Sequence, residues 1–553
     1  MRVFLVSLLW LVAASVAQAQ PPNIIVILTD DQSPETISAY GTNIYTAVAD
    51  TPNIDAIAAA GVRFSNSFVQ SPLCQPSRTT LLTGKSAENH GVIRNARLWQ
   101  PQANIAEMLQ GAGYRTAAFG KSLHSPMGGV ADPVNPLVPV GFDHYNVNDG
   151  ADYIDPVTNL NGEAGHANPG YAADLWTQQA IDWIAAQQAA TPSAPFFVYI
   201  GHPGPHYPLV PRADHAGLFA GDIAKPASYT DDLLGRSPLA AAATSSLAFW
   251  YPAYGSWTSC AAVAHGVVQP PLEIDPGPCN SDDLADAEQK TEWFYQQHVH
   301  DYLRVVRGID VNVGELRAYL ATSGLAANTV VIFAADNGFL LGEHFLSGKY
   351  LSYEQSIRVP LMMEGPGLPA GVVDASLVSN LDWAPTILDL AGVEIPAAME
   401  GRSLLERLDG TPPEDWRQAV YIRNHAGNGN RWYGIRTSRY KLIHHDRVHE
   451  WELIDLQEDP LELTNVYGDE QYADVVAALE TEMASLGVPS RHRCPGDANL
   501  DGGVSTLDGS IVRRCLNKVA TGICAAADFD GNGVINSLDW ILTGKSIGTT
   551  CAR

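Results

Sequence analysis

One cysteine of this chain stands apart from the other six. Residues 71–85 read SPLCQPSRTTLLTGK and place Cys74 shortly before a proline, with Arg78 further along. The remaining cysteines can pair locally, Cys260 with Cys279 and those at 494, 515, 524 and 551 among themselves. In an oxidising compartment the unpaired cysteine needs an explanation. Cys74 is therefore a candidate for chemistry, the alternatives being a buried free thiol or an interchain disulfide.

Oxygen-bearing side chains follow two apolar runs. Asp30 and Asp31 come directly after NIIVILT, and Asp336 and Asn337 come directly after TVVIFAA. Each pair alone is common in turns at strand ends. Together they offer three carboxylates and an amide, which suit Ca²⁺ or Mg²⁺ better than zinc.

Basic side chains occur in three short polar segments, FGKSLH, GHPGPHYP and GEHFLSGKY. They are Lys121, His124, His202, His206 and Lys349. Singly, each is as well explained by a surface lysine or a hydrogen-bonded histidine. If they converge with Arg78 and a cation, they form a pocket for a small tetrahedral oxyanion.

The elements that must position these residues are buried strands alternating with helices. NIIVILT, PFFVYIG and TVVIFAA are continuous apolar runs, and DLWTQQAIDWIAAQQAA between them has a helical pattern. This alternation predicts an α/β fold with a large, mainly parallel or mixed sheet sandwiched by helices. Sites in such sheets form at the carboxyl ends of strands, where these polar residues fall.

The chain divides into five predicted parts. Residues 1–19 have the pattern of a signal peptide, and 20–414 form the α/β domain, with 215–290 as a surface insertion. Residues 415–487 predict a small antiparallel α+β subdomain, 488–494 a linker, and 495–553 a helical module with Ca²⁺ loops. The net charge of −27 excludes nucleic acid as a partner, and no segment after the signal predicts a membrane span. The protein is expected to be secreted, periplasmic or on the cell surface.

The C-terminal module contains an internal repeat, DANLDGGVSTLD and DFDGNGVINSLD. Each copy has oxygen-bearing side chains at the positions of a Ca²⁺ loop, with glycine at the sharp turn. The predicted ligands are Asp497, Asn499, Asp501, Ser505, Asp508, Asp528, Asp530, Asn532, Asn536 and Asp539. The pair resembles a dockerin module, which implies folding by Ca²⁺ and a cohesin-like scaffold partner.

The segment CQPSRTTLLTGK resembles the sulfatase signature C-x-P-S-R followed by a helix that ends in T-G-K. Further resemblance lies in TPNIDAIAAAGVRFSNSF, LDWAPTILDLAG and WELIDLQEDPLELTN, and it spans residue 23 to about 466. It implies the alkaline-phosphatase-like fold and oxidation of Cys74 to formylglycine by a formylglycine-generating enzyme. The spacing of Lys121 and His124 is similar to that of the iduronate-2-sulfatase branch.

The resemblance also implies residue roles. The active-site Ca²⁺, in preference to Mg²⁺, would be held by Asp30, Asp31, Asp336, Asn337 and the modified Cys74. The catalytic residues would be Cys74, Arg78, Lys121, His124, His206 and Lys349. His202 would share the sulfate site with His206. Candidates for binding the sugar are Arg94, His144, His425 and Arg431, which have equally good structural explanations.

The chemistry implied is hydrolysis of a sulfate ester. One hydroxyl of a hydrated aldehyde attacks sulfur and displaces the alcohol. The second hydroxyl then loses its proton, the aldehyde re-forms, and sulfate is released. The dockerin-like module favours sulfated polysaccharide or glycosaminoglycan fragments as substrates. Two alternatives remain open: a phosphonate or phosphate mono- or diesterase of the same superfamily, and an inactive binding protein docked to a scaffold.

A peptide mass spanning residue 74 separates an enzyme from a silent binding protein. We expect an aldehyde at this position when the protein is made with a formylglycine-generating enzyme, because the surrounding residues match the signature. A thiol in that preparation would favour the binding protein.

Overall fold

The computed structural model describes residues 20–95, 102–123, 140–148, 150–233, 287–408, 413–425, 431–446 and 450–486, together with Arg513. The predicted signal peptide, His124, most of the predicted insertion, the linker and both Ca²⁺ loops lie outside the described residues. The same holds for every cysteine except Cys74.

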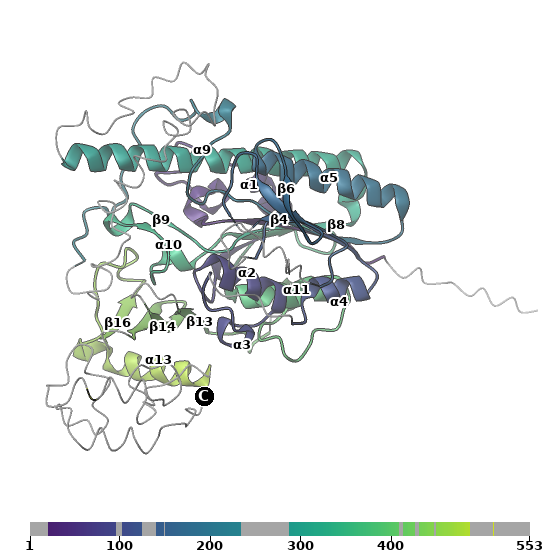
Figure 1. Ribbon diagram of the computed structural model, residues 1–553. Coiled ribbons are helices and arrows are strands. Elements are labelled where there is room, and N and C mark those ends of the chain that lie inside the picture. The colour runs from purple at the N-terminus through teal and green to yellow at the C-terminus, as the bar shows by residue number, and fades with distance from the viewer. Residues whose placement is uncertain are drawn as a thin grey trace, which may run out of the picture.

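A ten-stranded mixed sheet forms the centre of the molecule, in the order β12-β2-β11-β8-β1-β7-β3-β4-β5-β6 (Figure 1). The run from β8 to β4 is parallel, and β11, β5 and β6 are antiparallel to their neighbours. The strands are β1 (Asn23–Thr29), β2 (Val62–Phe68), β3 (Arg115–Lys121), β4 (His144–Asn148), β5 (Val157–Leu160), β6 (Glu163–Ala167), β7 (Phe196–Gly201), β8 (Thr329–Ala335), β11 (Leu361–Glu364) and β12 (Val372–Ser379).

Helices cover both faces of this sheet (Figure 1). One layer contains α1 (Pro52–Ala60), α5 (Ala172–Ala190) and α9 (Ala287–Thr322), and the other contains α2 (Cys74–Thr83), α4 (Ile105–Gly111) and α11 (Trp383–Leu390). The remaining short α-helices are α3 (Ala87–His90), α10 (Glu354–Ile357) and α12 (Leu405–Leu408). Short 3-10 helices are η1 (Pro34–Thr36), η2 (Ser38–Tyr40), η3 (Ala213–His215), η5 (Leu325–Asn328), η6 (Glu343–Phe345), η7 (Asn380–Asp382) and η8 (Glu470–Tyr472).

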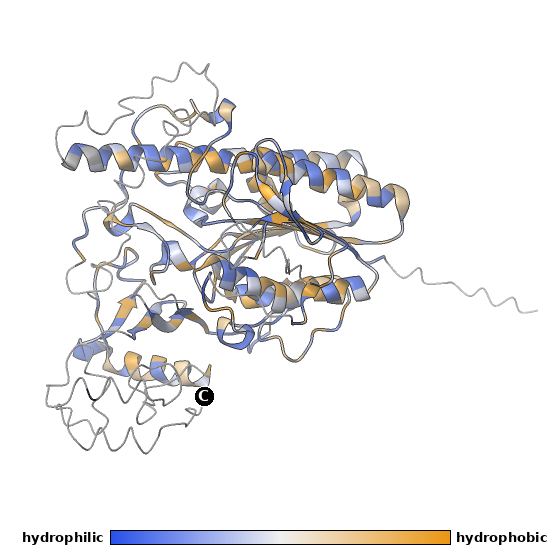
Figure 2. Ribbon diagram, in the orientation of Figure 1, coloured by the Kyte–Doolittle hydropathy of each residue, from blue (hydrophilic) through white to orange (hydrophobic). Residues whose placement is uncertain are grey.

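The apolar sequence of β1 is explained by burial on both faces. Its alternate residues pack into different clusters, Ile24 and Val26 toward the layer of α2 and Ile25 and Ile27 toward that of α9. Figure 2 shows the same pattern, with hydrophobic colour on the central strands. Continuous apolar runs are expected for strands covered on both sides, so the predicted α/β sandwich is confirmed.

A second, four-stranded antiparallel sheet follows in the chain. It has the order β13 (Ala419–Asn424), β14 (Trp432–Thr437), β15 (Tyr440–His445) and β16 (Glu450–Asp455), and α13 (Ala473–Ser485) packs against it. A small apolar cluster joins this sheet to the main domain, with Val420, Ile422 and Trp432 contributing from the sheet and Ile357 from α10. A two-stranded ribbon, β9 (Leu340–Leu341) and β10 (Ser347–Gly348), lies in the segment before α10. The predicted antiparallel subdomain is confirmed.

Asp310 of α9 fixes the start of α1. Its carboxylate accepts hydrogen bonds from the backbone N–H groups of Asn53 and Ile54, at 2.8 and 2.9 Å. We expect Asp310→Ala to lower the free energy of unfolding by about 2–3 kcal/mol, because two N–H groups of a helix end lose their acceptor. Thermal or urea unfolding measures this loss.

Asp50 provides the matched control. It pairs with Arg307, as Asp310 does, but its side chain is 72% exposed. Asp50→Ala should lower the free energy of unfolding by less than about 1 kcal/mol, because water screens an exposed ion pair. Equal losses in the two variants would contradict the capping role.

Candidate active site

The two acidic pairs meet at the carboxyl ends of adjacent parallel strands. β1 and β8 pair in register up to Thr29 and Ala335, so the residues that follow lie side by side. The N–H of Asp31 donates to Asp336 Oδ1 at 3.2 Å, and Asn337 Nδ2 donates to Asp31 Oδ1 at 2.7 Å. Asp31 has a φ of 63°, a left-handed conformation that is uncommon outside glycine. This turn brings three carboxylates and an amide into one buried cluster.

Helix α2 places Cys74 at the same point. The helix begins at Cys74, and its polar residues are buried along its whole length. The hydroxyls of Thr79 and Thr83 donate to the carbonyls four residues earlier, at 2.7 and 2.8 Å, which satisfies them within the helix. Gly84 ends the helix in a left-handed conformation, with a φ of 65°. The Thr-rich, apolar sequence is therefore that of a buried helix whose N-terminus carries the cysteine.

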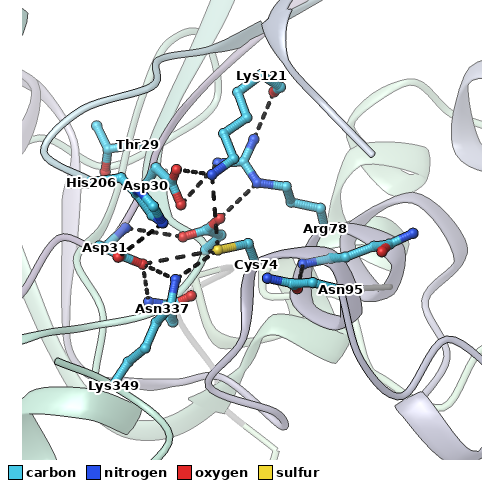
Figure 3. A network of polar contacts seen from close by, with 12 residues as sticks. Thr29, Asp30, Asp31, Cys74, Arg78, Asn95, Lys121, His206, Asn337 and Lys349 are labelled. Carbon is cyan, nitrogen blue, oxygen red and sulfur yellow. Dashed lines mark hydrogen bonds and ion pairs between the residues drawn. The ribbon is translucent and has the colours of Figure 1, made fainter. Parts of the chain in front are cut away.

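The sulfur of Cys74 lies between two lysines (Figure 3). Lys349 Nζ is 2.8 Å from Cys74 Sγ, and Lys121 Nζ is 4.0 Å from it. Both ammonium groups are also paired with carboxylates, Lys349 with Asp31 and Lys121 with Asp30. The cysteine thus lies inside the charged cluster and not beside it.

Arg78, one turn further along α2, ties the helix to the sheet. Its Nε donates to Asp336 Oδ2 at 2.6 Å, and its Nη1 donates to the Lys121 carbonyl and to the Tyr199 hydroxyl, at 2.6 and 2.7 Å. Its Nη2 is 3.8 Å from Asp30 Oδ1. Because these partners come from four different strands or their ends, a planar guanidinium with several donors suits the position better than an ammonium would.

The protonation of these groups follows from burial and from their neighbours. Burial, reinforced by Asp30, raises the pKa of the Cys74 thiol, so the sulfur keeps its proton. Burial would raise the pKa of Asp30 as well, but Lys121 and the other cations hold it well below its ordinary value. Burial would lower the pKa of Lys349, yet Asp31 holds it well above the ordinary value. The cluster is therefore one of buried carboxylates balanced by buried cations.

The donor set fits a hard cation. Burial, opposed by Arg78 and reinforced by the neighbouring carboxylates, raises the pKa of Asp336 to about 7. Two oxygens, Asp30 Oδ1 and Asn337 Oδ1, are buried without a hydrogen-bond partner among the described residues. Ligand atoms within 4.8 Å of one another are offered by Asp30, Asp31, Cys74 and His206. Together with Asp336 and Asn337, the two aspartates of this group supply three carboxylates and an amide oxygen, a donor set that suits Ca²⁺ or Mg²⁺.

The two histidines of the GHPGPHYP segment have different surroundings. His206 Nε2 lies 3.7 Å from Asp31 Oδ2, and its side chain is 28% exposed, so it lies at the open side of the cluster. His202 is 1% exposed, and burial lowers its pKa to about 4. Of the two, His206 is the one that the structure brings to the cluster of Cys74.

The four candidates for sugar binding do not join the cluster. His144 begins β4, and its ring contacts Phe119. The strand end near Lys121 is four residues further on, roughly 13 Å away at the rise of a strand. His425, which directly follows β13, contacts Glu88 Oε1 of α3 through its Nε2 at 2.9 Å. Arg94 and Arg431 are exposed.

Two supporting residues were not predicted from the sequence. The Tyr199 hydroxyl contacts Arg78 but lies within an apolar strand that gives no sign of a polar role. Asn380 accepts a hydrogen bond from the Gln70 N–H and donates one to Ser77 Oγ, at 2.9 Å each, and so fixes the first turn of α2. The sequence pattern that could have identified Asn380 is an amide residue directly after a strand, which is the pattern that identified Asn337.

The fold and this cluster define a hydrolase of the alkaline-phosphatase-like superfamily. Within it the chain belongs to the sulfatase family, whose model, described as sulfatase, matches residues 22–393. Residues 342–488 match the model described as N-sulphoglucosamine sulphohydrolase, C-terminal, and residues 495–545 match the dockerin type I domain. Within the described part of the chain, no helix has both the length and the hydrophobicity that a bilayer crossing requires.

Several known proteins are similar over most of their length. The N-acetylglucosamine-6-O-sulfatase of Bacteroides thetaiotaomicron is 33% identical over 497 residues, covering 82% of this chain and 84% of that protein. The human N-acetylglucosamine-6-sulfatase is 27% identical, covering 75% of this chain and 69% of its own. A solved structure in complex with its substrate D-glucosamine-2-N,6-O-disulfate matches with a TM-score of 0.75 and 32% identity, covering 84% of this chain and 97% of that one.

The unpaired amide oxygen of Asn337 gives a test for the cation. We expect Ca²⁺ to raise the melting temperature of the protein, because a ligand that binds only the folded state stabilises it. Asn337→Ala should need on the order of tenfold more Ca²⁺ for the same rise, since it removes one oxygen ligand.

Asn66→Ala is the control for that measurement. Asn66 Nδ2 donates to the Ala375 carbonyl at 2.7 Å in an exposed hydrogen bond, and its strand β2 lies three strands away from β1 in the sheet order. Both variants retain the C-terminal loops, so a difference between them reports position 337. Identical Ca²⁺ responses would contradict the assignment.

Proposed function

We propose that this protein is an exported sulfatase that removes sulfate esters from sulfated sugars, with 6-O-sulfated glucosamine as the substrate class. The observation that carries the proposal is the position of Cys74, which begins a buried helix with its sulfur 2.8 Å from Lys349 Nζ and 4.0 Å from Asp31 Oδ1. The substrate class is supported by the similarity to two N-acetylglucosamine 6-sulfatases and to the glucosamine disulfate complex.

Conversion of Cys74 to formylglycine is part of this proposal. A hydrated aldehyde supplies one hydroxyl to attack sulfur and a second whose deprotonation expels sulfate. A cysteine thiol has one nucleophilic atom and no second hydroxyl, so a sulfated cysteine would have no equivalent route to release. The N-terminus of α2 favours negative charge at this position, as a reacting sulfate requires.

The charged residues around position 74 have distinct proposed tasks. Asp30, Asp31, Asp336 and Asn337 would hold Ca²⁺, which supplies positive charge next to the sulfuryl oxygens. Lys121 and Lys349 flank the sulfur from two sides and would bind the remaining oxygens of the sulfate.

Proton transfer is assigned to the histidines. His206 lies at the open side of the cluster and would protonate the oxygen of the leaving sugar. His124 would accept the proton of the second hydroxyl, and it lies outside the described residues.

The C-terminal match extends the proposal to location and partner. The dockerin type I match at residues 495–545 supports an extracellular protein that docks through its Ca²⁺ loops to a cohesin-like scaffold. The N-terminal signal-peptide pattern supports export. In this arrangement the sulfatase would act beside other enzymes of polysaccharide degradation.

Phosphonate or phosphate ester hydrolysis is the second candidate. The chain is 26% identical to a multifunctional alkaline phosphatase superfamily protein of Trinickia caryophylli, and the match covers 82% of this chain and 93% of that protein. It also shares its fold, with a TM-score of 0.63, with the phosphonate monoester hydrolase of Agrobacterium radiobacter. A tetrahedral oxyanion pocket alone does not separate a sulfate from a phosphate ester.

A substrate panel tests the proposal on protein made with a formylglycine-generating enzyme. We expect N-acetylglucosamine 6-sulfate to be hydrolysed with kcat/KM well above that of an aryl phosphodiester. Cys74→Ala should abolish turnover, and Cys74→Ser should retain at most one covalently bound sulfate per chain, visible by mass. Preference for the phosphodiester would favour the second candidate, and turnover by Cys74→Ala would overturn the role of position 74.

A further inference from the structure

The backbone next to Lys349 is held in an unusual conformation. Tyr350 has a φ of 76°, in the left-handed region that bulky residues rarely adopt. Such a conformation persists only where surrounding contacts enforce it. Because Tyr350 is the next residue in the chain, contacts that hold its carbonyl and its backbone conformation restrict the backbone from which the Lys349 side chain leaves.

Those contacts come from the antiparallel sheet. Trp432 Nε1 donates to the Tyr350 carbonyl at 2.7 Å, and Asn424 Nδ2 donates to the same oxygen at 3.0 Å. Trp432 and Asn424 are cross-strand partners in β14 and β13, and their side chains are 0% and 1% exposed. Two buried donors on neighbouring strands therefore converge on one carbonyl of the main domain.

A second anchor follows at Glu354, the first residue of α10. Its backbone N–H donates to Glu462 Oε2 at 2.8 Å, and its carboxylate accepts two hydrogen bonds of 3.1 Å from Arg436 of β14. Lys441 of β15 pairs with Glu462 in the same buried network. The segment after Lys349 is thus attached to the antiparallel sheet at both of its ends.

We propose that the antiparallel sheet is a positioning element for catalysis, and that Trp432 and Asn424 are positioning residues that act through Lys349. The inference rests on the proposed function, in which Lys349 binds the reacting sulfate. Lys349 Nζ is 2.8 Å from Cys74 Sγ and ion-paired with Asp31, and a buried lysine with a long, flexible side chain needs a fixed backbone to hold such a position. The sheet supplies that fixed point.

Trp432→Phe tests the inference by removing one N–H while keeping an aromatic ring. We expect kcat/KM for an activated aryl sulfate to fall about tenfold, because a small displacement of a positioned group is costly to catalysis. The matched control is Trp416→Phe: Trp416 Nε1 also donates to a backbone carbonyl, that of Leu377, at 2.9 Å, and its side chain is 5% exposed. It serves the edge strand β12, so activity should change less than about twofold.

A double-mutant cycle with Lys349→Ala separates positioning from a structural role. If Trp432 acts through Lys349, Trp432→Phe should slow the Lys349→Ala enzyme less than about twofold, since the group it positions is absent. An equal slowing in both backgrounds would overturn the inference, as would equal activity of Trp432→Phe and Trp416→Phe. Melting temperatures of all variants show whether each is folded in the assay.

Asn424→Ala keeps the test decisive if Trp432→Phe does not fold, with Asn66→Ala as its control. Asn424→Ala is combined with Lys349→Ala in the same kind of double-mutant cycle. Equal slowing by Asn424→Ala in the presence and absence of Lys349 would overturn the inference. Failure of the proposed function is distinguishable, because the wild-type protein and Trp416→Phe, both made with a formylglycine-generating enzyme, would then hydrolyse no sulfate ester. Failure of the inference alone leaves those two proteins active and Trp432→Phe equal to its control.

Discussion

Three carboxylates buried at the ends of β1 and β8 are the constraint on which the rest of the site depends. Asp30, Asp31 and Asp336 are at most 1% exposed and lie within contact of one another. Like charges in a low dielectric raise one another's pKa unless cations are close. Arg78 and two lysines provide those cations from α2, from the end of β3 and from the segment after β10. The active-site cluster is therefore held together by charge balance as much as by packing.

Charge balance also explains why so many elements end at the same place. The strand order β8-β1-β7-β3 brings the carboxyl ends of four parallel strands to one edge of the sheet. Helix α2 adds its N-terminus, with Cys74 as the first residue. A cation at the unpaired oxygens would replace part of the balancing charge, leaving the lysines available to a bound oxyanion.

The sequence allowed prediction of the fold and of the acidic cluster, because buried parallel strands are continuous apolar runs and their ends meet. Asp30 and Asp336 were identifiable on those grounds, and Cys74 was identifiable as the cysteine without a local partner and by the residues around it. Trp432 and Asn424 were not, since a side-chain donor to a distant carbonyl has no local pattern. The start of β4 at His144 was not predictable either, because the ends of elements are the least certain feature of a sequence-based prediction.

The antiparallel sheet follows the α/β domain in the chain, and buried contacts join the two. The matched C-terminal family model begins at residue 342, before Lys349, and runs to residue 488, beyond α13. The segment that carries the lysine therefore belongs to the same matched unit as the strands that hold it. Its lysine completes a cluster built by the other elements, so the surroundings of Cys74 are linked to the sheet through the anchors at Tyr350 and Glu354. A sheet that held this segment differently would move the Lys349 cation away from the sulfur and would also remove part of the charge that balances Asp31.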